Sequence, residues 1–200
     1  MFTPAESALE RGWPGRIDGD HVVQLAAQTL QSYFSGGSKA REHAVYPLAE
    51  VLLRAPVLEP PSVRLFEDAA SFAFANPAAI RSPGAEIPRP DGRLDVALRL
   101  AAVVGRDGAL GGWTGLAEWR APELGTTKDR DFALLLGPVV DTDPADGFDW
   151  EEARALAARN TRLRPGDLLG GPVLELREDV PSGAFAHSFP GLGELAARVA

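Results

Sequence analysis

The sequence predicts a mostly β fold of the α+β class, built from short strands with few helices. The first observation is that 21 glycines and 17 prolines, residues that favour turns, separate short apolar runs along the 200 residues. Many short strands divided by such turn residues are typical of β-rich domains. The second observation is that 45% of the residues are hydrophobic, which is enough for a sizeable core. We expect a small N-terminal hairpin and helix unit over residues 1–45 and a β-rich main domain over residues 46–200.

The N-terminal unit is predicted from two local patterns. Asp18-Gly19 lies between the short apolar pieces of residues 16–23, and this arrangement is typical of a β-hairpin. From Val22 to Phe34 apolar residues recur at helical spacing, and Gly36-Gly37 would end that helix. Residues 38–47 are polar, so we expect a linker there.

The main domain is predicted around one buried strand, residues 95–105, which is apolar almost throughout and closed by a glycine. Residues 113–119 and 132–140 predict a strand, a corner and another strand. Residues 150–159 form a short helix candidate, with Asp149 as its N-cap. The end of the chain predicts a turn at residues 164–167 before Leu168-Leu169, and a last turn and strand at residues 190–195.

Charge and composition exclude several function classes. A net charge of −8 with a pI near 4.9 disfavours binding to nucleic acid or to an anionic membrane. The absence of cysteine excludes disulfides and thiolate sites. No apolar run approaches the roughly 18 residues that a membrane span needs, and the N-terminus has no signal-peptide pattern. We expect a cytoplasmic protein.

Five stretches, in the right order along the chain, resemble motifs of the fumarylacetoacetate hydrolase family. They are Phe74-Ala75-Asn76-Pro77 through Ser82-Pro83-Gly84 to Ile87-Pro88; the strand of residues 95–105; Gly112-Trp113-Thr114 to Trp119; Lys128 to Phe132 with Leu136-Gly137-Pro138; and Leu163-Arg164-Pro165-Gly166-Asp167. The resemblance implies a distorted β-sandwich roll that forms a homodimer. It also implies Mg²⁺- or Mn²⁺-assisted chemistry on oxo-acids and 1,3-dicarbonyl compounds, in which a hard cation stabilises an enolate.

The resemblance also shows where this chain departs from the family. The two metal-binding glutamates of the family's central strand fall on Ala97 and Arg99, and the third carboxylate falls on Glu118. A guanidinium has no lone pair to donate and is always charged. We therefore expect no metal and no other cofactor at this place. The family's lysine near the site falls on Arg130.

Two interpretations of the remaining polar residues stay open. In the first, Arg99, Glu118 and Arg130 are catalytic, and Arg99, Arg130 and Lys128 bind a small anionic or dicarbonyl ligand. The protein would then be a metal-independent hydrolase, lyase, isomerase or cyclase. In the second, Arg99 and Glu118 form a salt bridge that plugs the vacated site, and Lys128 is a surface residue. The protein would then be an inactive dimeric scaffold or the partner of an active homologue.

Overall fold

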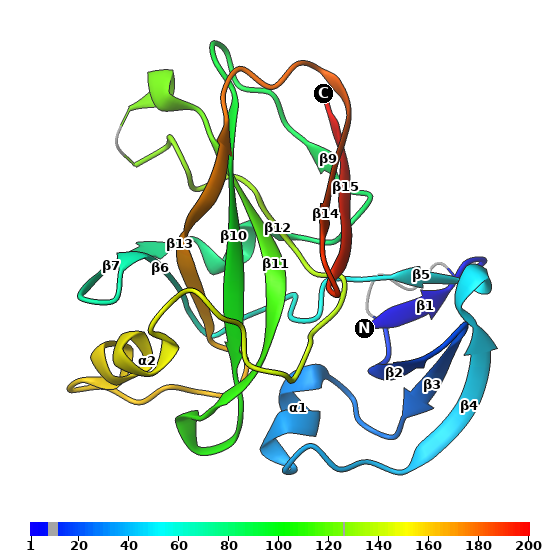
Figure 1. Ribbon diagram of the computed structural model, residues 1–200. Helices are drawn as coiled ribbons and strands as arrows, with labels where there is room; N and C mark the ends of the chain where they lie inside the picture. Colours follow the sequence, from blue (N-terminus) through cyan, green and yellow to red (C-terminus); the bar gives the residue numbers. More distant parts are fainter. Residues whose placement is uncertain (8–11, 126) are drawn as a thin grey trace.

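The structure is a computed structural model that describes residues 1–7, 12–125 and 127–200 (Figure 1). Its centre is a seven-stranded sheet in the order β7-β6-β13-β10-β11-β12-β8. The strands are β6 (Val63–Asp68), β7 (Ser71–Ala75), β8 (Ile80–Arg81), β10 (Asp95–Val104), β11 (Leu110–Arg120), β12 (Leu134–Leu136) and β13 (Leu168–Arg177). In the middle of the sheet, the long strand β10 pairs antiparallel with both β11 and β13, while β13 pairs parallel with β6 on its other side. The buried strand predicted at residues 95–105 is therefore confirmed.

A second, three-stranded sheet packs against one face of the central sheet (Figure 1). It consists of β9 (Glu86–Ile87), β14 (Gly183–Phe189) and β15 (Gly193–Val199). Alternate residues of β10 and β11 point into the core between the two sheets, and Trp119 is completely buried there. Its ring meets that of Phe185 edge to face, with centroids 4.9 Å apart. The two packed sheets form the predicted mostly β roll.

The helix α2 (Trp150–Ala158) lies near β6 and β13 (Figure 1), and its Trp150 packs in one apolar cluster with Ala102 of β10 and Leu169 of β13. The Asp149 carboxylate accepts a hydrogen bond from the Glu152 backbone N–H at 2.8 Å, so the predicted N-cap is confirmed. The described residues also include four short 3₁₀ helices that connect strands: η1 (Leu48–Glu50), η2 (Pro77–Ala79), η3 (Arg106–Gly108) and η4 (Pro122–Leu124).

The N-terminal segment forms its own small sheets beside the roll (Figure 1). They comprise β1 (Phe2–Pro4) paired with β5 (Val51–Leu53), and the sheet β2 (Gly15–Asp18), β3 (His21–Leu25) and β4 (Glu42–Pro47). The predicted hairpin at residues 16–23 is confirmed. Of the predicted N-terminal unit, residues 8–11 lie outside the described part of the chain. The division at residues 45 and 46 stays a prediction, and β4 itself continues to Pro47.

Two local predictions for this segment were wrong. The helix expected from Val22 onward is only α1 (Leu30–Ser35), and Val22 to Leu25 belong to β3. Pairing of β3 with both β2 and β4 decides the conformation there, and the Thr29 hydroxyl caps the shorter helix. The polar stretch expected to be a linker contains β4, because a strand with one exposed face needs few apolar residues.

The main domain also differs in detail from the predictions. Of the strand expected over residues 132–140, only the three residues of β12 form one, and the rest is irregular chain. The turn at residues 164–167 and the strand after it are confirmed. The last predicted strand is β15, while its partner β14 was not predicted.

One prediction concerns His187 on β14. Burial lowers the pKa of His187, the nearby Arg177 charge lowers it further, and Glu175 opposes both effects. Arg177 Nη2 lies 2.8 Å from His187 Nδ1, so the neutral ring can accept a hydrogen bond there. The folded protein therefore favours neutral His187, whereas the unfolded chain takes up a proton near a pKa of about 6.5. Stability from this residue is complete above that pH and is lost as the pH falls below it.

We expect the Tm of the wild-type protein to fall more between about pH 7.5 and pH 5.5 than that of His187→Gln, whose side chain stays uncharged and can still accept from Arg177. Differential scanning calorimetry at the two pH values measures both losses. Equal losses in the two proteins would contradict the role given to His187.

Candidate functional site: a buried arginine–glutamate cluster

The site is built on the face of the central sheet that looks away from β14 and β15. Glu118 on β11 lies directly opposite Ala97 on β10, and Arg99 follows two residues later on the same face of β10. The side chains of Arg99 and Glu118 are both completely buried, and Arg99 Nε donates to Glu118 Oε2 at 3.0 Å. The two residues therefore face each other as the sequence predicts.

Arg99 is held by three strands besides its own. Its Nη1 donates to the carbonyl oxygens of Phe66, at 2.9 Å, and Gly171, at 2.7 Å. Its Nη2 donates to Glu67 Oε1 at 2.7 Å. The strands β6 and β13 pair up to Leu65 and Gly170, so the guanidinium bridges the next carbonyl on each strand. The side chain thus continues the sheet's hydrogen bonding where these two strands stop pairing.

Glu118 is surrounded by positive charge. Arg120 Nη2 donates to Glu118 Oε2 at 2.7 Å, and Arg130 Nη1 lies 3.6 Å from Glu118 Oε1. Oε1 is buried and has no hydrogen-bond partner among the described residues. Arg130 is 36% exposed and Arg120 is 18% exposed, so both connect the buried carboxylate to the surface. Together with Glu67, these residues form what we call the arginine–glutamate cluster: Glu67, Arg99, Glu118, Arg120 and Arg130.

The cluster does not fit a divalent cation. The Oε2 atom of Glu118, which would be a ligand, already accepts hydrogen bonds from Arg99 and Arg120. Ala97 supplies no oxygen from its side chain, and the guanidinium of Arg99 would repel the ion. Over residues 1–7, 12–125 and 127–200, no group of three or more His, Cys, Asp or Glu residues could hold a metal ion.

Lys128, the fourth predicted site residue, lies at the surface. Its side chain is 72% exposed, and within the described part of the chain its ammonium pairs with Asp131, at 2.9 Å, rather than with Glu118. The structure therefore brings together Arg99, Glu118 and Arg130 and leaves Lys128 outside their contacts.

Glu67 and Arg120 are the members of the cluster that sequence reasoning missed, and the contact of Glu67 depends on a local irregularity of β6. The β6–β7 pairing shifts between Phe66 and Asp68, so Glu67 occupies a bulge and has no partner in the register of β7. The side chain is 62% exposed, yet its Oε1 atom contacts buried Arg99. The sequence around Glu67 does not predict this contact, because the bulge forms only when β6 pairs with its neighbouring strands.

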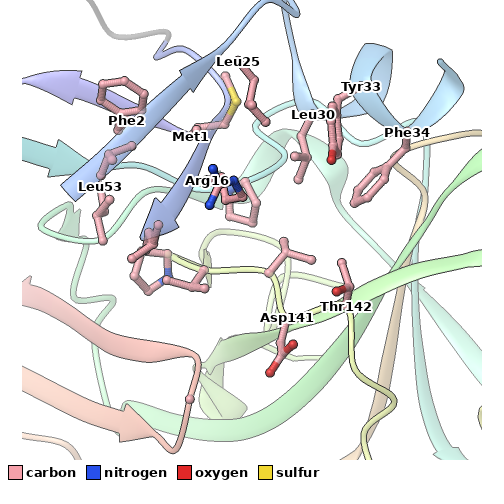
Figure 2. A pocket seen from close by; sticks show the side chains of 18 residues that line it. Met1, Phe2, Arg16, Leu25, Leu30, Tyr33, Phe34, Leu53, Asp141 and Thr142 are labelled. Carbon is pink, nitrogen blue, oxygen red and sulfur yellow. The ribbon is translucent and has the colours of Figure 1, made fainter. Parts of the chain in front are cut away.

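A separate cavity of about 450 Å³ lies where the N-terminal segment meets the roll (Figure 2). Figure 2 shows Leu30, Tyr33 and Phe34 of α1 on one side and Asp141 and Thr142 of the chain after β12 on another. Most of its lining residues are apolar, and Arg99, Glu118, Arg130 and Lys128 are not among them. This cavity and the arginine–glutamate cluster are therefore distinct places in the fold.

The chain has the fumarylacetoacetate hydrolase-like fold, in which a small sheet packs against a central sheet that carries the cluster residues Arg99 and Glu118 on β10 and β11. Solved structures with this fold include maleylpyruvate hydrolase from Sphingobium sp. SYK-6, with a TM-score of 0.77 and 20% identity over 95% of this chain and 96% of that chain. A second structure of that hydrolase, in complex with manganese(II) ion and pyruvate, has a TM-score of 0.79 at 19% identity, with the same coverage.

The 5-carboxymethyl-2-hydroxymuconate delta-isomerase from Mycobacterium smegmatis is also similar, with a TM-score of 0.75 and 18% identity over 94% of this chain and 93% of that chain. At such identities the likeness establishes the fold. No family model and no curated protein matches the sequence. Within the described residues, no helix is long and apolar enough to cross a membrane.

Proposed function

We propose that this protein is a metal-independent enzyme of the fumarylacetoacetate hydrolase type that acts on a small oxo-acid or 1,3-dicarbonyl compound. The observation that carries the proposal is the buried Oε1 of Glu118, which accepts no hydrogen bond from the described residues and lies 3.6 Å from Arg130 Nη1. A carboxylate oxygen without a hydrogen bond, next to a partly exposed guanidinium, suits proton transfer next to an anion. The hydrolase and the isomerase that share the fold support a small-molecule substrate.

In this proposal Glu118 is the base and the arginines take the place of the cation. The C–H bond between two carbonyl groups breaks, the proton moves to Glu118 Oε1, and the electron pair moves to a carbonyl oxygen as an enolate. Arg130 stabilises that oxygen from the surface side, because it lies next to Oε1 and is partly exposed. Arg99 is already bonded through all its nitrogens, so it supplies a fixed positive charge and orients Glu118. Lys128, at the exposed rim, attracts the anionic substrate.

Turnover of a panel of acylpyruvates and oxaloacetate, measured with a chelator present, tests the proposal. We expect Arg130→Gln to lower kcat/KM by about 100-fold, the usual loss when one donor to a developing oxyanion is removed. Arg130 is partly exposed, so the variant should fold normally. Arg162→Gln, which removes an exposed arginine elsewhere, is the matched control and should keep full activity. Turnover that requires Mg²⁺ or Mn²⁺ would contradict the proposal.

The second candidate is a non-catalytic scaffold, favoured by the complete burial of Arg99 and Glu118. If the bonded guanidinium only fills a vacated site, the protein turns over none of the panel with or without Mn²⁺. Arg130→Gln then changes nothing in the assay.

We also propose that the protein is cytoplasmic, from its sequence composition, and that it is a homodimer, as the sequence resemblance implies. Leu174 and Leu176 on β13 are 62% and 47% exposed, and apolar side chains in such a position suit an interface between two copies. Light scattering after size exclusion measures the mass directly.

A further inference from the structure

Glu67 makes the unusual contact in the cluster. A completely buried guanidinium, Arg99, bonds at Nη2 to a carboxylate whose side chain is 62% exposed. The other three bonds of Arg99 go to the buried Glu118 carboxylate and to two main-chain carbonyls. Glu67 is therefore the partner of Arg99 that can move away without breaking the sheet.

The surroundings of the Glu67 carboxylate are those of an anion site. Its Oε1 lies 2.7 Å from Arg99 Nη2 and 3.9 Å from Arg120 Nη2. Arg120 Nε is buried and has no partner among the described residues. Three guanidinium groups face two carboxylates in the cluster, so removal of Glu67 leaves an excess of positive charge beside Glu118. A carboxylate brought by a ligand would meet the same two nitrogens.

The backbone gives Glu67 freedom to leave. The residue sits in the bulge of β6, outside the register with β7, so its main chain is not fixed by a pair of ladder bonds to that strand. The Glu67 side chain is 62% exposed, so water solvates its carboxylate as soon as it leaves Arg99, and the incoming ligand supplies the negative charge that buried Arg99 needs. A ligand carboxylate that contacts both arginines can therefore displace it.

We propose that the Glu67 carboxylate is an internal stand-in that occupies the subsite for the carboxylate of the ligand. The subsite consists of Arg99 Nη2 and Arg120, and it takes small carboxylates. Glu67 closes the buried cluster in the free protein and swings out when a ligand binds. This inference rests on the proposed function for the identity of the ligand, but carboxylate binding can be measured without turnover.

Isothermal titration with malonate tests the stand-in. We expect Glu67→Gln to bind malonate about fivefold more tightly than the wild type, because binding no longer has to displace an ion pair. Glu86→Gln removes an exposed carboxylate from β9 and is the matched control for net charge, so its affinity should equal that of the wild type. Glu67→Gln combined with Arg120→Gln should lose the gain.

Three outcomes would overturn the inference: Glu67→Gln binds malonate no better than wild type, Glu86→Gln gains as much, or neutral malonamide competes as well as malonate. The proposed function fails separately. If Glu67→Gln binds malonate more tightly but no oxo-acid is turned over, the carboxylate subsite is supported and the proposed enzymatic function is contradicted. If the protein turns over an oxo-acid without metal but Glu67→Gln does not change malonate binding, the proposed function is supported and the role of Glu67 as a stand-in is contradicted.

Discussion

Arg99→Met is expected to lower the free energy of unfolding by about 3–5 kcal/mol, the usual cost of removing one partner from a buried ion pair. The change leaves Glu118 buried with less compensating charge, and it leaves the Phe66 and Gly171 carbonyls without their donor. Urea denaturation followed by tryptophan fluorescence measures the loss, since Trp119 lies next to Glu118 in the sequence and is buried.

The double variant Arg99→Met with Glu118→Met separates charge from packing. Replacement of both partners by apolar groups avoids an uncompensated charge, so this variant should be more stable than Arg99→Met alone. Arg16→Met is the matched control, because Arg16 is exposed and its ion pairs with Asp18 and Glu42 are at the surface. A stability of Arg99→Met equal to that of Arg16→Met would contradict the structural role of Arg99.

A double substitution, Ala97→Glu with Arg99→Glu, is expected to create a Mn²⁺ site. Positions 97 and 99 share one face of β10, and position 97 lies opposite Glu118 on β11. Three carboxylates would then face one another, which destabilises the protein without an ion and favours binding of a hard cation. At a Mn²⁺ concentration 100 times the dissociation constant, the gain in stability is about 2.7 kcal/mol.

Thermal unfolding with and without MnCl₂ measures this gain. The control carries Ala97→Gln and Arg99→Gln, which have similar size and no charge. The wild type should show no shift, because Arg99 repels the ion. Stoichiometric, micromolar binding of Mn²⁺ or Mg²⁺ to the wild type would contradict the account of the site, as would a double-glutamate variant that gains no more than the glutamine control.

The sequence predicted those parts of the fold that depend on local pattern. Apart from Arg99, the run from Val96 to Val104 is apolar on both faces, so a central strand was predictable. Segments decided by pairing were not predictable. Val22 to Leu25 fit helical spacing, but their neighbours β2 and β4 hold them as a strand.

The same distinction applies to the site. Arg99, Glu118 and Arg130 were found because the sequence resembles the motifs of a known family at these positions, and the structure gathers their charged groups. Glu67 and Arg120 carried no such signal. The contact of Glu67 depends on a bulge, and that of Arg120 depends on its position two residues beyond Glu118 on β11. Such contacts arise from the assembled sheet.

The bridge that Arg99 makes between the Phe66 and Gly171 carbonyls has a consequence for what the fold can tolerate there. These two oxygens, with the carboxylates of Glu67 and Glu118, form an all-acceptor niche. If Arg99 were removed, the two carbonyl oxygens would need new donors, such as water molecules, and the two carboxylates would lose a compensating charge. The guanidinium meets both needs at once, because it carries the donors and the positive charge on a side chain of the sheet itself.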